Sequence, residues 1–291
     1  MENPKFVDVK GVRTRYFESG QGDPLVLVHG GAFGGFDNAE DWEVNFDSLA
    51  EQFHTYAIDK VGQGFSDPPL SDEEFVIGAH VNHIYDFMSA VGIDSAHVAG
   101  HSRGGYAVTR LALEHPEVVR TLTIIDSSTL MTPPNPIYDE WARQAANIPD
   151  PREQIRYLMG ANSFRDDHVT EHYIDVALEI RDLPKSKDVV RRMDDGLRDQ
   201  FKTDLVARQP ETHAWIRDGG IKCPTLVIWA FNDPSATMEH CGIPCMELIL
   251  PSVPNSQMHI VNEAGHYCYR EQPEAFEDVL VTFIKKNSEE G

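Results

Sequence analysis

The sequence predicts an α/β fold, with a mostly parallel central sheet flanked by helices and an inserted helical cap. Three observations indicate this fold: short apolar runs that each end in polar residues or glycine, helical patterns between those runs, and a middle stretch without strand patterns. Strands of a parallel sheet covered on both faces are apolar almost throughout, as these runs are. A chain of 291 residues is long enough for one large domain with an insertion.

Six apolar runs mark the expected strands. They cover residues 25–28, 55–58, 96–99, 121–125, 225–229 and 257–261, and they are followed by His29-Gly30, Asp59, Gly100, Asp126, Asn232-Asp233 and Asn262. Because the carboxyl ends of parallel strands form one edge of a sheet, we expect these polar residues to converge on a common crevice.

Residues 132–220 have a different composition, which opens with Pro133, Pro134 and Pro136 and carries many charges. Helices are expected over 137–146, 151–159, 168–180 and 189–201, with N-terminal caps at Asp150 and Asp167. Residues 1–131 and 221–291 are therefore expected to form the core, and 132–220 the cap. A last amphipathic helix is expected over 273–286, and the acidic end Ser288-Glu289-Glu290 is expected to be solvated.

The charge of the chain excludes two classes of partner. Lys and Arg number 25 against 47 Asp and Glu, a formal net charge of −22, which repels nucleic-acid phosphates and anionic lipids. No apolar run approaches the ~20 residues of a membrane-spanning helix, and the N-terminus lacks the pattern of a secretory signal. We expect a cytoplasmic protein that binds neither nucleic acid nor membrane, and leave its oligomeric state open between monomer and homodimer.

The cysteines predict neither a disulfide framework nor a metal site. Cys223, Cys241, Cys245 and Cys268 are few for this length, and a reducing compartment keeps them as thiols. Cys241 and Cys245 lie near His240, but no second pair of ligands completes a zinc site. We therefore expect no metal.

Gly100-His101-Ser102-Arg103-Gly104 forms a G-x-S-x-G motif between an expected strand and a helical run. In that context a sharp turn raises the serine at the edge of the sheet, and the flanking glycines remove side chains that would collide across the turn. Ser102 is the expected nucleophile. The amide of Arg103, at the start of a helix, is an expected donor to an oxyanion.

His29-Gly30-Gly31-Ala32 follows an earlier expected strand. Glycine allows the backbone to approach a ligand closely, so the Gly31 amide is the expected second donor of an oxyanion hole. A glycine-rich turn alone is a weak signal, but a second donor loop is what the serine motif requires.

A serine nucleophile needs a base, and the base needs a carboxylate to hold its tautomer. His266 is the expected base because it lies in a loop after the last strand, whereas His259 falls inside that strand and His54, His97 and His115 fall away from the carboxyl edge. Asp233 is the expected acid, since it gives the chain order Ser, Asp, His. Asp126 also ends a strand and remains the alternative.

These motifs resemble those of the α/β-hydrolase family over essentially the whole chain, the cap included. Within that family the sequence is most similar to the meta-cleavage-product hydrolases, which cut a carbon–carbon bond in dienol diketones formed by aromatic-ring dioxygenases. The residues that carry the resemblance are His29-Gly30-Gly31, Gly100-His101-Ser102-Arg103-Gly104-Gly105, Ile125-Asp126-Ser127-Ser128-Thr129-Leu130, Asn232-Asp233-Pro234-Ser235 and Ala264-Gly265-His266-Tyr267.

The resemblance implies a small-molecule substrate and a Ser-His-Asp mechanism without a cofactor. It suggests five residues that contact substrate: Gly30, Ala32, His101, Arg103 and Tyr267.

The chain departs from better-known members, which have asparagine and tryptophan where it has His101 and Tyr267, and a cap arginine near Ala177. Arg103 and Arg181 are candidates to replace that arginine, because a guanidinium can bind a carboxylate through two hydrogen bonds. A carboxylesterase or lactonase would use the same triad, and a receptor could retain it.

Overall fold

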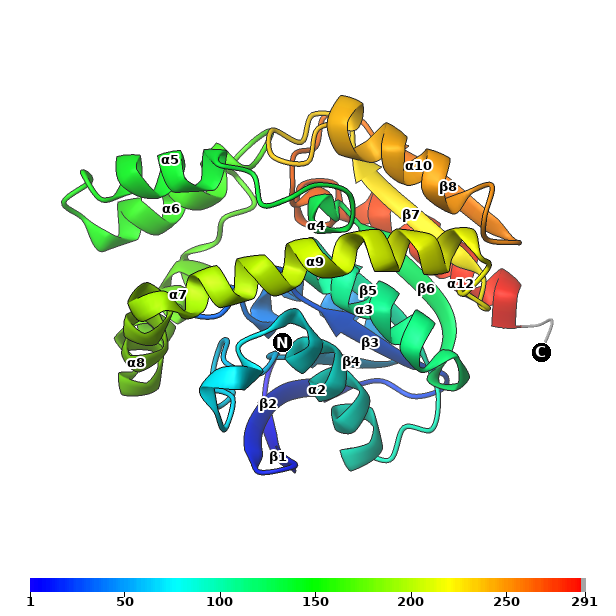
Figure 1. The fold of residues 1–291 in the computed structure, drawn as a ribbon, viewed down its shortest axis with the longest axis horizontal. Coiled ribbons are helices and arrows are strands. Elements are labelled where there is room, and N and C mark those ends of the chain that lie inside the picture. The colour runs from blue at the N-terminus through cyan, green and yellow to red at the C-terminus, as the bar shows by residue number, and fades with distance from the viewer. Residues whose placement is uncertain (289–291) are drawn as a thin grey trace.

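The computed structural model describes residues 1–288, so Glu289 and Glu290 of the acidic end lie outside the described residues. A single mixed sheet forms the centre of the molecule (Figure 1). Its strands are β1 (Lys5–Val9), β2 (Val12–Ser19), β3 (Pro24–Val28), β4 (His54–Ile58), β5 (Ala96–His101), β6 (Val119–Ile125), β7 (Thr225–Ala230) and β8 (Ser256–Val261). Their order is β1-β2-β4-β3-β5-β6-β7-β8, and the strands from β4 to β8 run parallel.

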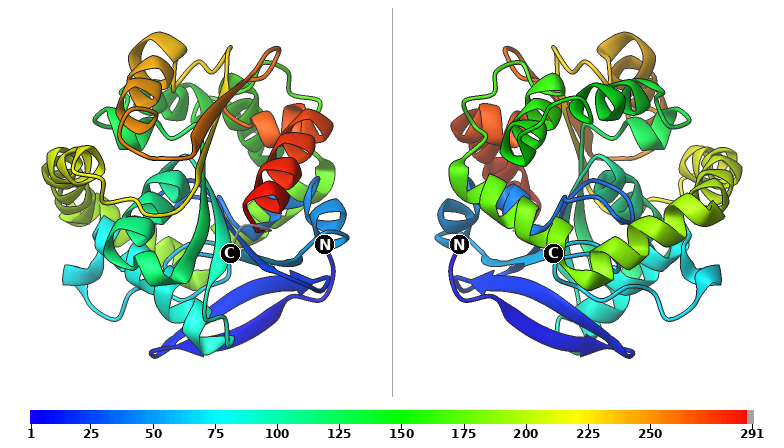
Figure 2. Two further views of the ribbon diagram at one scale, coloured as in Figure 1. Left: turned by 90° about the vertical axis from the view of Figure 1, so that its right-hand side faces the viewer. Right: turned by 90° about the vertical axis from the view of Figure 1, so that its left-hand side faces the viewer.

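The sheet is covered on both faces, as the apolar runs predict. Alternate side chains of β3 enter different cores: Val26 and Val28 pack on one side, Leu25 and Leu27 on the other. Figure 2 shows the sheet edge-on between the two layers of helices. The first layer contains α2 (Ile77–Ala90), α3 (Arg103–Glu114) and α10 (Ile243–Ile249), and the second contains α1 (Phe46–Ala50), α11 (Cys268–Glu271) and α12 (Pro273–Ser288).

Helices connect β6 to β7, and residues 132–220 hold no strand in this described part of the chain. After the short α4 (Ser128–Met131) come α5 (Ile137–Ala145), α6 (Pro151–Ala161), α7 (Glu171–Asp182), α8 (Pro184–Arg192) and α9 (Arg198–Arg217). α9 crosses in front of the sheet, and α5 to α8 lie beyond the ends of the central strands (Figure 1). Residues 132–220 are called the cap below. That they form a unit distinct from the core stays a prediction.

Several expected boundaries in the cap were wrong. Asp150 does cap its helix, since its side chain accepts a hydrogen bond from the Arg152 amide at 2.9 Å. The next helix begins at Glu171 instead of near Asp167, because the hydroxyl of Thr170 accepts from the Tyr173 amide and caps it there. The single helix expected over 189–201 is divided between two helices, since α8 ends at Arg192, Gly196 is non-helical with φ 124°, and α9 runs from Arg198 to Arg217.

Two strands at the start of the chain, β1 and β2, are not among the strands predicted from the sequence. β1 and β2 form an antiparallel hairpin, with Val9 opposite Val12, and β2 pairs antiparallel with β4.

No helix within residues 1–288 has both the length and the apolar character needed to cross a membrane.

Candidate active site

Ser102 occupies a strained turn between β5 and α3. Its backbone has φ 53° and ψ −120°, a conformation that side chains rarely adopt. The turn requires a residue without a side chain at position 104, because a Cβ at Gly104 would lie 2.4 Å from the carbonyl oxygen of His29. The Ser102 amide donates to the carbonyl of Ile125 at 2.8 Å, which anchors the turn to the end of β6.

His266 and Asp233 form a buried pair beside this turn. Nδ1 of His266 lies 2.6 Å from Oδ2 of Asp233, and both side chains are almost fully buried. The other oxygen of Asp233 accepts the amides of Ser235 and Ala236, both at 2.7 Å, and the Ser235 hydroxyl at 3.0 Å. These donors hold the carboxylate in one orientation, so the imidazole that it contacts is held as well.

The backbone of His266 is held from both sides. Its amide donates to the carbonyl of Asn162 in the cap at 2.8 Å. Its carbonyl accepts a hydrogen bond from Nε2 of His101 at 2.8 Å. Burial lowers the pKa of His101 well below its usual value, so this ring is neutral and donates through Nε2. His101 therefore holds the backbone of His266, and the two ring centroids lie 4.6 Å apart.

Asp126 is buried behind the pair and has a different role. Its Oδ1 accepts the amide of Ala230 at 2.7 Å, while its Oδ2 has no hydrogen-bond partner within residues 1–288. Burial, with the charge of Asp233 as a further cause, raises the pKa of Asp126 well above its usual range. A carboxyl whose pKa is raised in this way, and which makes no hydrogen bond to His266 within the described residues, is poorly suited to orient that imidazole.

Ser102 and His266 line one cavity of about 400 Å³. Gly31, Ala32, His101, Arg103 and Tyr267 line it as well, so it holds most of the residues predicted to act on substrate. Asp233 is not at its surface and lies behind His266. Within the described residues no hydrogen bond joins the Ser102 hydroxyl to His266, although the two side chains share this cavity.

Gly30 was predicted to contact substrate, and it does not line the cavity. It packs against His101 and Ser102: a Cβ at Gly30 would lie 3.1 Å from both Nδ1 of His101 and Cβ of Ser102. The carbonyl of Gly30 accepts hydrogen bonds from the protein interior.

The two amides expected to bind an oxyanion are free to donate. Within residues 1–288 neither the Gly31 nor the Arg103 amide donates to another group. Gly31 has φ 74°, and a Cβ there would lie 2.1 Å from a carboxylate oxygen of Asp37, so only glycine fits.

The cavity also contains polar residues that the sequence analysis missed. These are Asp37, Tyr138, Asp139, Asn162, Arg198 and Lys202. Most of them come from the cap, where helical periodicity does not show which face meets the core. Tyr138 connects the cap to the Asp233–His266 pair, because its hydroxyl donates to that of Ser235 at 2.8 Å, and Ser235 in turn donates to Asp233.

Arg103 presents a cation to this cavity. Its Nε has no hydrogen-bond partner within residues 1–288. Burial lowers the pKa of its guanidinium, although an arginine still remains charged. The guanidinium lies 5.8 Å from the ring centre of Phe201 on the cap. A half-buried cation that forms no ion pair within residues 1–288 is suited to bind an anionic group of a ligand.

Two other residues, Arg181 and Asp59, lie away from the cavity where they were expected. Arg181, the other proposed replacement for the family's cap arginine, is exposed, donates to Gln154 at 3.1 Å and lines an adjoining cavity instead. Asp59 does not join a common crevice, because its carboxylate is used to bind Arg15 at 2.6 Å and the Ala39 amide at 2.7 Å.

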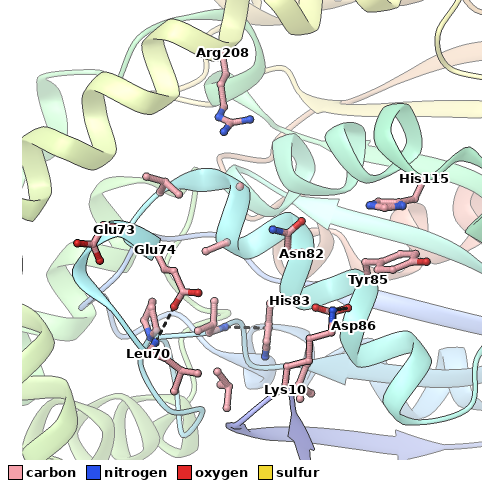
Figure 3. Close-up of a pocket in the computed structure, with 17 residues that line it drawn as sticks. Lys10, Leu70, Glu73, Glu74, Asn82, His83, Tyr85, Asp86, His115 and Arg208 are labelled. Carbon is pink, nitrogen blue, oxygen red and sulfur yellow. Dashed lines mark hydrogen bonds and ion pairs between the residues drawn. The ribbon is translucent and has the colours of Figure 1, made fainter.

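A second cavity, of about 610 Å³, lies beside α2 and contains none of the triad residues (Figure 3). Its charged groups are largely paired: Lys10 with Asp86 at 2.8 Å, and Arg208 with Asp204 at 2.8 Å. The imidazole of His83 is hydrogen-bonded at both nitrogens.

Comparison with known proteins shows the family. The model of the alpha/beta hydrolase fold matches residues 23–273. The chain belongs to the α/β-hydrolase family. This confirms the predicted fold class and supports hydrolase activity.

The similar proteins include enzymes of aromatic degradation, at low identity. The chain is 23% identical over 299 residues to a 2-hydroxy-6-oxo-6-(2'-aminophenyl)hexa-2,4-dienoic acid hydrolase of Metapseudomonas resinovorans, covering 98% of this chain and 92% of the relative. It is 26% identical to a 2-hydroxy-6-oxo-6-phenylhexa-2,4-dienoate hydrolase of Burkholderia cepacia, covering 96% of each.

A solved structure of a similar protein has the same fold as this chain. A mutant meta-cleavage product hydrolase from Pseudomonas fluorescens IP01, complexed with acetates, matches with a TM-score of 0.79 at 23% identity, covering 97% of both chains. The α/β hydrolase described here is thus related to carbon–carbon bond hydrolases.

Proposed function

We propose that this α/β hydrolase cleaves a carbon–carbon bond in a dienol or diketone of the ring meta-cleavage type. The observation that carries the proposal is the assembly of Ser102, His266 and two free amides around one cavity, with Asp233 bonded to His266. The relatives named above act on substrates of this type.

The first step is ketonisation of the dienol in the cavity: the enol proton moves to the carbon of the bond to be broken, and the new ketone can accept the electron pair of that bond when it breaks. Ser102, or a water activated in its place, then adds to the side-chain carbonyl, and its proton passes to Nε2 of His266. Asp233 stabilises the imidazolium through its contact with Nδ1. The tetrahedral oxyanion is bound by the amides of Gly31 and Arg103.

Cleavage follows when the tetrahedral centre collapses. The carbon–carbon bond breaks, its electron pair is delocalised over the conjugated leaving fragment, and His266 returns the proton to that carbon. Where Ser102 is the nucleophile, water then hydrolyses its acyl group; where water adds directly, the acid is released at once. Either way, one water is consumed for each bond cut. Because the substrate stabilises its own carbanion, the residues of a serine hydrolase suffice for the chemistry.

Arg103 is the proposed anchor for the substrate's carboxylate. Its guanidinium lacks a hydrogen bond at Nε within the described residues and lines the cavity beside the nucleophile. Arg198 and Lys202 add positive charge from the cap, against Asp37 and Asp139. The apolar remainder of the substrate would contact Phe33, Trp141, Leu158 and Val190.

A substrate panel tests the proposal. Purified enzyme is given a ring-fission dienol and a set of nitrophenyl esters, and kcat/KM is measured for each. We expect the dienol to be the better substrate. Esters hydrolysed faster by orders of magnitude would assign a carboxylesterase or lactonase with the same triad, and turnover of neither would favour a receptor.

A further inference from the structure

Lys60 is a fully buried lysine next to the candidate oxyanion hole, and burial lowers its pKa to about 7. It follows β4, and its side chain is inaccessible to solvent. Its ammonium donates to the carbonyl of His29 at 2.8 Å and to that of Gly30 at 2.7 Å. No carboxylate lies within ion-pair distance of it among residues 1–288. Burial of a lysine without a counter-ion is costly, so a role for it must be sought in what it contacts.

The fold brings Lys60 to this loop through strand pairing. β3 and β4 are parallel neighbours with Val28 opposite Ile58, so the segments that follow them leave the sheet at the same edge (Figure 1). His29 and Gly30 therefore lie beside Lys60. The main-chain amide of Lys60 donates to Nε2 of His29 at 3.2 Å, which fixes the relation between the two segments.

Several donors converge on the carbonyl oxygen of Gly30. Besides Lys60, the side-chain amide of Gln63 donates to it at 3.3 Å. Nδ1 of His29 lies 2.9 Å from the same oxygen. Since Nε2 of His29 accepts a hydrogen bond, the ring proton is on Nδ1, and this contact is a donation as well. A Gly-Gly peptide has little steric resistance to rotation, so these bonds set its orientation.

The orientation of this carbonyl sets the direction of the next amide. The chain has no cis peptide bond in its described part, so the C=O of Gly30 and the N–H of Gly31 are antiparallel in one planar unit. When the oxygen points toward Lys60 in the interior, the Gly31 N–H points the opposite way. Gly31 lines the triad cavity, where its amide has no other partner within residues 1–288.

We propose that Lys60 is a positioning residue for the oxyanion hole: by binding the Gly30 carbonyl, it aims and polarises the Gly31 amide toward the developing negative charge. The inference rests on the proposed function, since it assumes that Gly31 binds an oxyanion. Lys60 does not touch substrate. Hydrogen bonds polarise one another, so the hydrogen bond that Nζ donates to the Gly30 carbonyl strengthens the N–H donor on the same peptide.

The test compares Lys60→Met with wild type. Methionine keeps much of the apolar side chain and removes the donor. We expect kcat for a nitrophenyl ester to fall by about 10–100-fold, approaching the effect of losing one oxyanion donor, while KM stays within about 3-fold. The affinity for a phenylboronic acid, whose tetrahedral adduct occupies the oxyanion hole, should fall in parallel, and the affinity for a product acid should not.

A matched control separates this effect from loss of stability. Leu122→Ala in β6 removes a fully buried side chain away from the loop and lowers the melting temperature. Its kcat per folded molecule and its boronate affinity should stay at wild-type levels. If Lys60→Met does not fold, Gln63→Leu removes a weaker donor to the same carbonyl and should lower kcat and boronate affinity several-fold.

The outcomes distinguish the two proposals. Wild type that does not react with a fluorophosphonate would overturn the proposed function. Wild type that reacts, together with Lys60→Met or Gln63→Leu that keeps wild-type kcat and boronate affinity, would overturn the role of Lys60 alone. Equal losses of boronate and product-acid affinity would show a merely structural lysine.

Discussion

Asp233, and not Asp126, contacts the imidazole of His266, with 2.6 Å between Oδ2 and Nδ1. Both aspartates follow neighbouring strands, β6 and β7, and both are buried. What separates them is their hydrogen bonding: Asp233 accepts donors at both oxygens, whereas Oδ2 of Asp126 has no partner within the described residues. The geometry supports the acid that chain order favours.

The first prediction concerns these two acids. Asp233→Asn should lower kcat by about 10⁴-fold, because an amide no longer holds the right tautomer of His266. Asp126→Asn should change kcat by less than about 10-fold, since the amide oxygen can still accept from Ala230. Steady-state kinetics on both variants decide the matter, and equal losses would mean that the acid has been misassigned.

The second prediction is a pH dependence of stability. The pKa of Asp126 is raised in the folded state, so the folded protein holds this proton more tightly than the unfolded chain. The stabilising effect is complete below the unfolded pKa of about 3.9 and is lost as pH rises toward the folded value. Asp126→Asn removes this dependence.

Urea unfolding of wild type and Asp126→Asn at several pH values measures the effect. The stability of the variant relative to wild type should increase from pH 4.5 to pH 8. A difference that is constant with pH, or that decreases, would show that Asp126 is ionised in the folded protein.

The third prediction concerns Arg103. Arg103→Met removes the guanidinium but keeps the main-chain amide, so only binding of an anionic group should suffer. We expect kcat/KM to fall by about 10–100-fold for a substrate with a carboxylate, the range of a hydrogen bond to a charged group, and by less than about 3-fold for a neutral ester. Lys202→Met removes a cation of the cap instead, and its kcat/KM on the same two substrates is measured for comparison. Equal losses on both substrates would contradict a carboxylate-binding role.

The fourth prediction is that Ser102→Ala abolishes turnover and leaves the fold intact. The hydroxyl of Ser102 makes no hydrogen bond within residues 1–288, so its removal breaks no structural contact. We expect kcat to fall by at least about 10³-fold, with an unchanged circular dichroism spectrum and a melting temperature within a few degrees of wild type. An active Ser102→Ala would assign the nucleophile elsewhere.

Much of the fold could be predicted because its signals are local. Each central strand is a short apolar run, and the G-x-S-x-G motif predicts a strand before the turn and a helix after it. The hairpin of β1 and β2 could not be predicted in this way, because β1 is largely exposed and lacks such a run. α9 continues through Pro210, a residue that usually argues against a helix interior.

The site could be predicted only where a motif carries it. Ser102, His266 and Asp233 follow from motif and chain order. Lys60 and Asn162 could not be predicted, because their contacts join segments far apart in the sequence and no local pattern marks them. Gly30 was assigned to the wrong side of its loop, since a glycine motif does not show which way its carbonyl points.

The central claim is that Ser102 is a nucleophile activated by His266 and Asp233. Reaction with a fluorophosphonate, followed by mass spectrometry of the peptides, tests it most directly. The account predicts one adduct, on Ser102, formed rapidly in wild type and at least about 10³-fold more slowly in His266→Ala. An adduct on another residue, or labelling of Ser102 at the same rate without the imidazole, would contradict it.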